Sequence, residues 1–215
     1  MLEITVKLAL AYLLGSANGS LVLGRFRGVD IRTEGSGNAG GTNALRTHGV
    51  LFALGVILID VGKAVLAVTW IPGAALGGIG VANAAPDEWL RVACGAAAVI
   101  GHCWPVFYGF RGGKGMATLV GTYAVIAPGV FLVVVIGWLA FLLLFGYVGL
   151  ATILGAAAAP VYIFVQGSAL DSPLFLFGLA MAVLILFTHR GNVARIKSGQ
   201  EKRDFNVFTA RRHRS

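Results

Sequence analysis

Long apolar stretches dominate this chain of 215 residues. Segments 2–23, 50–71 and 89–107 each have about the 20 residues that a helix needs to cross a bilayer, and a longer apolar run covers 116–187. With 57% hydrophobic and 12% charged residues, the chain carries more apolar side chains than one water-soluble core could bury. We therefore expect an all-α fold, a polytopic integral membrane helical bundle with lipid as its main solvent.

The run 116–187 contains residues that interrupt helices. Pro128 with Gly129, Gly146 with Tyr147, and the stretch 166–173 divide it. These breaks predict four short spans in the run and seven spans in the chain. A coarser division gives two longer spans in the run and five in total.

Positive charge is concentrated in three segments. Of the seventeen Lys and Arg residues, fourteen lie in 25–46, 111–114 and 190–215, while other connections carry acids such as Asp87 and Glu88. Cytoplasmic loops are enriched in Lys and Arg, so the pattern predicts three cytoplasmic segments, an N-terminus outside and a cytoplasmic C-terminus. Segments on one side must be separated by an even number of spans, and both span counts satisfy this rule. The net charge of +8 therefore indicates membrane orientation and not nucleic-acid binding.

Residues 1–23 could also be a signal peptide that ends near residues 16–18. The basic segment directly after them belongs in the cytoplasm, which favours a retained span.

The first basic segment, 25–46, mixes glycines with neutral hydrogen-bonding side chains. Closely spaced glycines let successive backbone N–H groups approach one anion, and Arg46 adds a cation suited to phosphate. The GxxxxGK[ST] pattern of a P-loop is absent from the sequence. We predict a cradle for phosphate or acyl phosphate; the alternative is an ordinary glycine-rich turn. The candidate residues are Gly35, Ser36, Gly37, Asn38, Thr42, Asn43 and Arg46.

The second segment, 101–118, surrounds Lys114 with glycines directly before a helical run. A helix N-terminus and one ammonium can converge there on an anion. The alternative is that Arg111 and Lys114 only reach toward lipid headgroups. His102, near a membrane interface, fits a packed histidine better than a catalytic one. The candidate residues are Gly112, Gly113, Lys114 and Gly115.

The third segment, 188–202, contains His189 and Asn192, which share a face on a helical turn and could bind one substrate. A basic tail is a routine topology signal that accounts for Arg190 and Arg195, but it does not account for His189 and Asn192.

Two charges lie inside the span 50–71, Asp60 and Lys63. Ionisable groups at this depth are costly unless paired, so we expect an internal ion pair that orients the helix. Cys94 and Cys103 are about 13 Å apart along one predicted helix, too far to form a disulfide, and fit packing residues.

Three segments occur in a characteristic order: GSGNAGGTN followed by Arg46, GHCWPVFYGFRGGKGMAT, and HRGNVARIKSGQEK. Together they resemble the signature segments of the bacterial acyl-phosphate:glycerol-3-phosphate acyltransferases of the PlsY type. The resemblance implies transfer of a fatty acyl group from acyl phosphate to the 1-hydroxyl of sn-glycerol 3-phosphate, giving lysophosphatidic acid and phosphate. It implies one membrane-embedded domain, 1–215, in the bacterial cytoplasmic (inner) membrane, with the active site at the cytoplasmic face.

The resemblance also distributes roles over the candidate residues. It implies catalytic roles for Ser36, Arg46, His189 and Asn192. For substrate binding we expect Gly35, Gly37, Asn38, Thr42, Asn43, Gly112, Gly113, Lys114 and Gly115. We expect acyl phosphate, glycerol 3-phosphate and membrane lipid as partners, no nucleic acid, no metal, no cofactor and a monomer.

No histidine is followed by Asp in the His-x4-Asp spacing that many glycerolipid acyltransferases use for a general base. Acyl phosphate carries a good leaving group, so positioning two anions and stabilising the oxyanion could supply most of the acceleration. We expect direct attack by the glycerol hydroxyl, with a substrate phosphate oxygen or His189 taking the proton. A covalent Ser36 intermediate is the weaker hypothesis, because no base lies near Ser36 in sequence.

Two other functions fit parts of the pattern. A transporter or channel for a phosphorylated solute would also use broken helices and cationic glycine loops, although the chain shows no internal repeat. A membrane phosphatase would need a metal site or a nucleophilic histidine constellation, for which the acids are too few.

Overall fold

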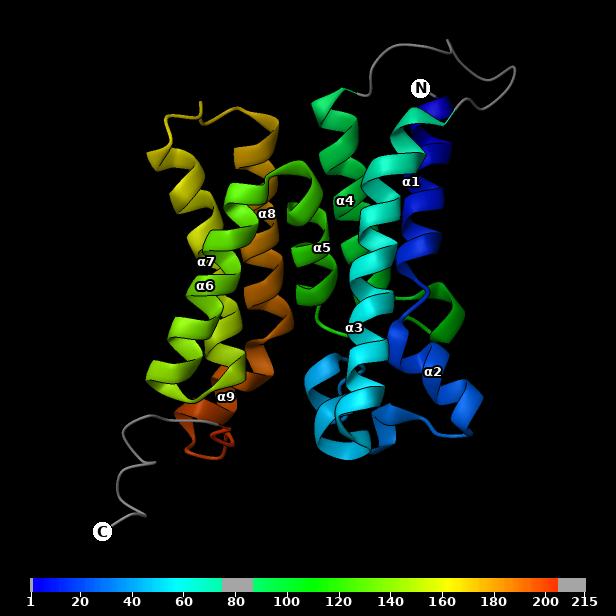
Figure 1. The fold of residues 1–215 in the computed structure, drawn as a ribbon, viewed down its shortest axis with the longest axis vertical. Coiled ribbons are helices and arrows are strands. Elements are labelled where there is room, and N and C mark those ends of the chain that lie inside the picture. Colours follow the sequence, from blue (N-terminus) through cyan, green and yellow to red (C-terminus); the bar gives the residue numbers. More distant parts are fainter. Residues whose placement is uncertain (1, 75–86, 205–215) are drawn as a thin grey trace. The chain divides into compact units, whose positions relative to one another are not determined.

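The computed structural model describes residues 2–74 and 87–204, and these contain helices and no strand, as the sequence predicts. Two compact units, Met1–Ile126 and Ala127–Ser215, are each described by themselves (Figure 1). Unit 1 contains α1 (Leu2–Gly15), α2 (Gly19–Arg27), η1 (Ile31–Thr33), α3 (Gly41–Gly73), α4 (Glu88–Cys103), η2 (Val106–Tyr108) and α5 (Met116–Ile126). Unit 2 contains α6 (Pro128–Phe145), α7 (Val148–Val165), α8 (Pro173–Thr188) and α9 (Arg190–Lys197).

The described helices have the length and apolarity of an integral membrane protein. Four candidate spans stand alone: α3, α4 together with η2, α6 and α7. The bent pairs α1–α2 and α8–α9 raise the number to six, and α5 is a shorter apolar helix of 11 residues. The expected all-α membrane class is confirmed, and the count of seven spans stays a prediction.

The first expected span, 2–23, is not one helix. It bends by 47° between α1 and α2. The cause is Asn18, whose side-chain oxygen accepts hydrogen bonds from the backbone N–H of Ser20 at 3.1 Å and of Leu21 at 3.3 Å. An asparagine in this position caps a new helix, so α2 begins where the apolar pattern alone predicts continuity.

The expected breaks in 116–187 coincide with the ends of helices. Pro128 begins α6, where its missing N–H costs no hydrogen bond. Gly146 ends α6, and Ser172 caps α8 by accepting a hydrogen bond from the N–H of Phe175 at 3.3 Å. In unit 2, α7 packs against both α6 and α8, and successive helices run in opposite directions (Figure 1).

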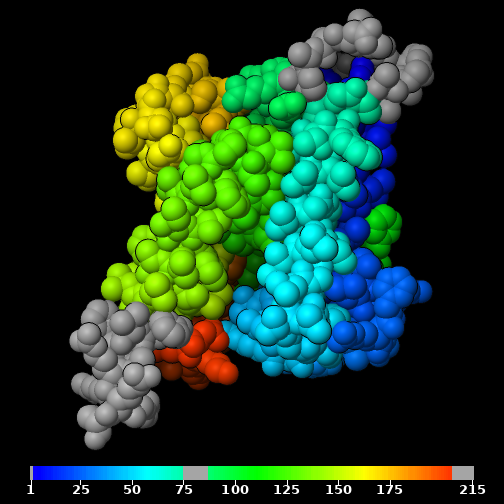
Figure 2. Space-filling view, viewed as in Figure 1, coloured from blue at the N-terminus to red at the C-terminus, as the bar shows by residue number. Residues whose placement is uncertain are grey.

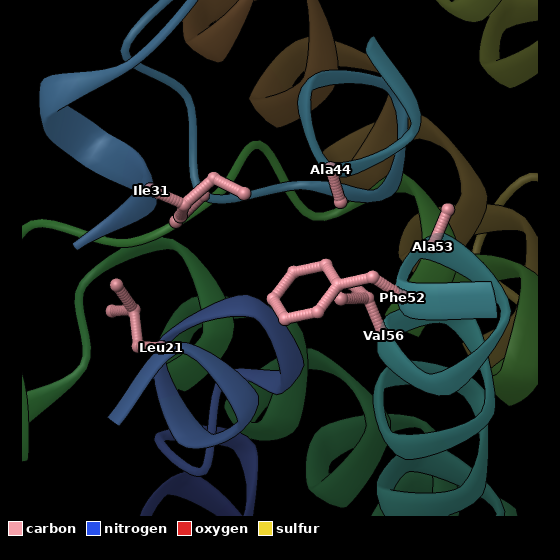
Figure 3. Close-up of a cluster of buried hydrophobic side chains, with 7 residues drawn as sticks. Leu21, Ile31, Ala44, Phe52, Ala53 and Val56 are labelled. Atoms are coloured by element: carbon pink, nitrogen blue, oxygen red, sulfur yellow. The ribbon is translucent and has the colours of Figure 1, made fainter. Parts of the chain in front are cut away.

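An apolar core holds the first basic segment at the N-terminal end of α3. Ile31 of η1 and Leu21 of α2 are buried in the same cluster as Phe52 and Val56 of α3 (Figure 3). In the space-filling view, α2 and the first segment gather at one end of α3 (Figure 2). The core therefore packs η1, in the middle of the first basic segment, against α2 and α3.

The opposite end of unit 1 joins the start of α1 to the end of α3. Lys7 Nζ donates to the carbonyl oxygen of Pro72 at 2.8 Å and pairs with Glu3 at 2.7 Å. The first basic segment and the start of α1 thus lie at opposite ends of the unit (Figure 1).

Candidate functional site

The first glycine segment is organised around the side chain of Asn43, which is 1% exposed. Its Oδ1 accepts hydrogen bonds from Ser36 N at 2.8 Å and Ser36 Oγ at 3.2 Å. Its Nδ2 donates to the carbonyl oxygens of Ile31 at 3.1 Å and Glu34 at 3.0 Å. These contacts tie 31–36 to the first turn of α3.

The side-chain amide of Asn43 is fully engaged inside the loop. Such an amide offers two hydrogens and an oxygen with two lone pairs, and each of these has a partner in the first segment. Asn43 therefore holds the segment, and substrate binding by this residue stays a prediction.

Two glycines allow the loop to turn over Asn43. Gly35 has φ +55° and Gly37 has φ +71°, in the left-handed region that favours glycine. A Cβ on Gly35 would overlap Asn43 Oδ1. The loop leads into α3, where Gly40 provides no side-chain cap, so the helix N-terminus beside Ser36 suits an anion.

The remaining candidates of the first segment differ in exposure. Ser36 and Arg46 are exposed, while Asn38 and Thr42 are half-buried. The Ser36 hydroxyl donates its hydrogen bond to the amide oxygen of Asn43 and not to a base. This contact disfavours a covalent serine intermediate.

The second glycine segment folds back on the end of α4. Gly112 N donates to the carbonyl oxygen of Cys103, and Gly113 N donates to that of His102, both at 3.1 Å. Gly115 O accepts a hydrogen bond from Leu119 N at 2.9 Å and so caps α5. Lys114, half-buried, lies two residues before the first residue of α5, Met116.

The structure brings the first two segments together. A Cβ on Gly113 would lie 2.8 Å from the carbonyl oxygen of Ala39 and would overlap Nε2 of His102. Only a residue without a side chain fits between the first segment and the His102 ring. His102 itself is 2% exposed, as expected for a packed histidine.

A second link between these segments is Arg32, which the sequence analysis did not single out. Its Nη1 donates to the carbonyl oxygens of Tyr108 at 2.9 Å and Arg111 at 3.0 Å. Its Nη2 pairs with Asp30 at 2.7 Å. The Arg32 hydrogen bond lowers the pKa of Asp30, so this carboxylate stays ionised at neutral pH and orients the guanidinium.

The third segment lies in unit 2, at the junction of α8 and α9. His189 follows α8 and Asn192 lies in the first turn of α9, and both side chains are buried, at 5% and 8% exposed. Asn192 Nδ2 donates to Glu201 Oε1 at 2.6 Å, and Arg195 Nε donates to Glu201 Oε2 at 2.6 Å. Glu201, not among the predicted site residues, thus fixes Asn192.

The contact of His189 defines its tautomer. Its Nδ1 lies 2.8 Å from the carbonyl oxygen of Ile185, which can only accept. Nδ1 therefore carries a hydrogen, and this hydrogen bond fixes the orientation of the ring.

The buried ion pair expected inside α3 is confirmed. Lys63 Nζ donates to Asp60 Oδ1 at 2.9 Å. His102 joins this pair, with Nδ1 3.2 Å from Asp60 Oδ1, a contact that the sequence did not predict. Cys94 and Cys103 are free and buried, consistent with packing residues.

Known proteins resemble this chain over most of its length. The family described as glycerol-3-phosphate acyltransferase matches residues 5–199. A glycerol-3-phosphate acyltransferase of Chlorobium luteolum is 39% identical, covering 94% of this chain and 97% of the relative. One of Aquifex aeolicus is 36% identical, covering 90% of this chain and 95% of the relative.

A solved structure is similar over nearly the same extent. It is a crystal structure of PlsY, an integral membrane glycerol 3-phosphate acyltransferase, in the glycerol 3-phosphate form. It shares 33% identity and a TM-score of 0.79, covering 93% of this chain and 94% of that chain. A lysophosphatidic acid form of PlsY gives a TM-score of 0.77. The extent of these similarities assigns the chain to the glycerol-3-phosphate acyltransferase family.

Proposed function

We propose that this protein transfers a fatty acyl group from acyl phosphate to the 1-hydroxyl of sn-glycerol 3-phosphate, releasing phosphate and lysophosphatidic acid. The main support is the contact of two glycine segments at Ala39 and Gly113, each leading into a helix N-terminus. Two adjacent sites for anions suit a reaction in which both substrates carry phosphate. The names of the similar proteins support glycerol 3-phosphate as the acceptor.

The candidate residues of the first two segments have proposed tasks. The N–H groups at the start of α3 bind one phosphate group, with Gly35 and Gly37 shaping the loop beside it and Ser36, Asn38 and Thr42 as added hydrogen-bonding groups. Asn43 holds this loop in place. Lys114 and the N-terminus of α5 bind the phosphate of glycerol 3-phosphate, and Gly112, Gly113 and Gly115 let the backbone approach it. Arg46, His189 and Asn192 act in the transfer step.

The transfer itself needs little covalent chemistry. The glycerol hydroxyl attacks the acyl carbon, the bond to the phosphate oxygen breaks, and phosphate leaves with the electron pair. The proton of the hydroxyl passes to a phosphate oxygen or to Nε2 of His189, whose Nδ1 hydrogen is held by Ile185 O. Stabilisation of the oxyanion by positioned N–H groups and cations supplies most of the rate.

The membrane arrangement is part of the proposal. Seven spans place the N-terminus outside and all three basic segments at the cytoplasmic face of a bacterial inner membrane. The chain would act as a monomer with both units in one acyltransferase domain and with no cofactor.

The decisive assay supplies purified protein in lipid with glycerol 3-phosphate and one donor at a time. Acyl phosphate should yield lysophosphatidic acid, whereas acyl-CoA and acyl carrier protein should not. Activity with acyl-CoA alone would refute the proposed donor. Phosphate release from acyl phosphate without glycerol 3-phosphate would indicate a phosphatase, and solute flux without acyl transfer would indicate a transporter.

A further inference from the structure

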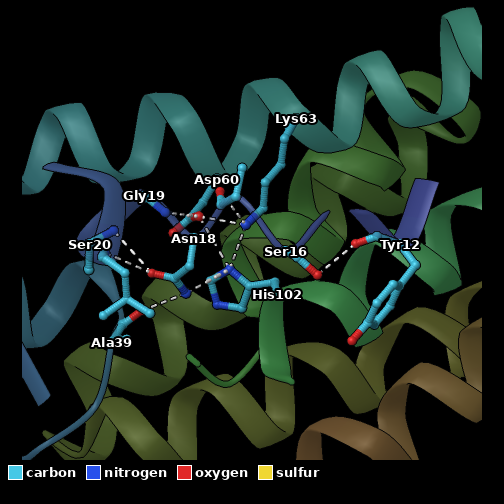
Figure 4. Close-up of polar contacts among 11 residues, drawn as sticks. Tyr12, Ser16, Asn18, Gly19, Ser20, Ala39, Asp60, Lys63 and His102 are labelled. Carbon is cyan, nitrogen blue, oxygen red and sulfur yellow. Dashed lines mark hydrogen bonds and ion pairs between the residues drawn. The ribbon is translucent and has the colours of Figure 1, made fainter. Parts of the chain in front are cut away.

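A buried polar cluster lies where α1 ends and α2 begins (Figure 4). Its members are Asn18 and Asp60, both 0% exposed, His102 at 2% and Lys63 at 4%. Ionisable groups inside a membrane protein are costly unless they are paired, and they mark functional sites by default. The ion pair between Asp60 and Lys63 and the cap of α2 by Asn18 explain part of the cluster, but they do not explain the presence of His102 beside them.

Lys63 Nζ has three polar neighbours at the cluster. It donates to Asp60 Oδ1 at 2.9 Å and to Ala17 O at 3.2 Å, and it lies 3.0 Å from His102 Nδ1. The same ring nitrogen lies 3.2 Å from Asp60 Oδ1. Both charged groups of α3 therefore face Nδ1 and hold the ring from one side.

Asn18 approaches the same ring nitrogen from another element. Its Oδ1 is occupied by the cap of α2, so Nδ2 is the group that faces His102 Nδ1 at 3.5 Å. The ring is thereby oriented from two sides, by α3 and by the turn between α1 and α2.

The cluster extends to both glycine segments. Asn18 Nδ2 donates to Ala39 O of the first segment at 3.2 Å. Gly113 N of the second segment donates to His102 O at 3.1 Å, and Nε2 of the ring occupies the space where a side chain of residue 113 would lie. The His102 residue and the Asn18 amide therefore set the spacing between the first and second glycine segments.

We propose that Asn18, Asp60, Lys63 and His102 are positioning residues for the glycerol 3-phosphate site. They hold the first segment at Ala39 against the second at Gly113, so that both phosphate-binding loops keep their separation. The inference rests on the proposed function, because it assigns glycerol 3-phosphate to the second segment. In this proposal the buried charges of Asp60 and Lys63 support the substrate site in addition to orienting α3.

The chain contains a matched control for this idea. Lys7 is also a buried lysine of unit 1, 6% exposed, paired with Glu3 and bonded to a backbone carbonyl oxygen, but it lies at the other end of the unit. Lys7→Met and Lys63→Met both remove a buried cation and leave a buried carboxylate or carbonyl oxygen unpaired. A purely structural role predicts that both lower the melting temperature and that neither changes KM.

The positioning role predicts a different result. Lys63→Met should raise the KM for glycerol 3-phosphate about tenfold, with kcat per folded enzyme changed less than about threefold and the KM for acyl phosphate unchanged. Lys7→Met should lower only the melting temperature. Equal KM values in the two variants, in an active preparation, would overturn the inference.

A second pair of variants avoids removing the cation. In His102→Asn the side-chain amide can take the place of Nδ1 beside Lys63 and Asp60, whereas in His102→Gln the amide extends toward the position of Nε2. His102→Asn should keep the KM for glycerol 3-phosphate within about threefold, and His102→Gln should raise it about tenfold. A normal KM in His102→Gln refutes the role. If Lys63→Met does not fold, the two His102 variants still test the role.

The two hypotheses fail in different ways. A wild-type protein that makes no lysophosphatidic acid from acyl phosphate and glycerol 3-phosphate refutes the proposed function. An active wild type, with KM unchanged in Lys63→Met or His102→Gln, refutes only the positioning role.

Discussion

Asn43 Oδ1 accepts two hydrogen bonds from Ser36, one from its backbone N at 2.8 Å and one from its hydroxyl at 3.2 Å. A residue at the start of α3 thereby fixes the conformation of the loop that precedes it.

Asn43→Asp should inactivate the enzyme more than tenfold. The carboxylate keeps the acceptor for Ser36 but loses the hydrogens that Nδ2 donates to Ile31 O and Glu34 O. Leaving buried partners unpaired costs about 1–3 kcal/mol, and a negative charge would face two carbonyl oxygens. Turnover per folded enzyme measures the effect, with Thr47→Val as the control because that hydroxyl donates to Asn43 O within α3 and not to the loop. Equal activity in both variants would contradict the role of Asn43.

Gly149→Ala should reduce kcat about tenfold or more, since a methyl group there would lie 2.7 Å from Cβ, Cγ and Nδ2 of Asn192. The clash would move Asn192 away from Glu201, which holds its amide at 2.6 Å. Gly137→Ala in the same unit is the control, because the nearest atom, Cε2 of Phe141, is 3.9 Å away. Steady-state kinetics of the two variants check this, and comparable kcat values would exclude the steric argument.

Lys114→Ala should raise the KM for glycerol 3-phosphate at least about tenfold, because it removes an ammonium beside the start of α5. Arg111→Ala removes a neighbouring cation that is exposed and should change KM less than about threefold. Initial rates over a range of glycerol 3-phosphate concentrations separate the two. An unchanged KM with normal turnover in Lys114→Ala would refute phosphate binding by this residue.

The link between Asp30 and Arg32 should persist to acidic pH. The hydrogen bond from Arg32 lowers the pKa of Asp30 from its ordinary 3.8, so the folded state favours the ionised carboxyl. The stability from this pair is present above pH 3.8 and is lost as the pH falls through the lowered pKa. The melting-temperature difference between wild type and Asp30→Asn should therefore stay constant from about pH 5 to 8 and shrink only below that window. A difference that disappears between about pH 5 and 7 would argue against the pair.

The sequence by itself determined the membrane class and most of the helix boundaries. Hydropathy and helix-breaking residues act locally, so Pro128, Gly146 and Pro173 mark the observed helix ends without knowledge of the fold. The spacing of Asp60 and Lys63 was enough to predict their ion pair, because i and i+3 share a helix face. The three signature segments were enough to indicate the family.

Only the tertiary structure decided which polar groups meet. The contact between Asn18 and His102 joins residues 84 positions apart, and Arg32 reaches Tyr108 across 76 positions. No local pattern contains such pairs, since they depend on how α1, α3 and α4 pack. The support that Asn43 gives to the first loop joins residues 7 to 12 positions apart, and it too depends on the folded conformation of the loop. Local composition therefore indicated the chemistry of the segments, and long-range packing determined which side chains hold them in place.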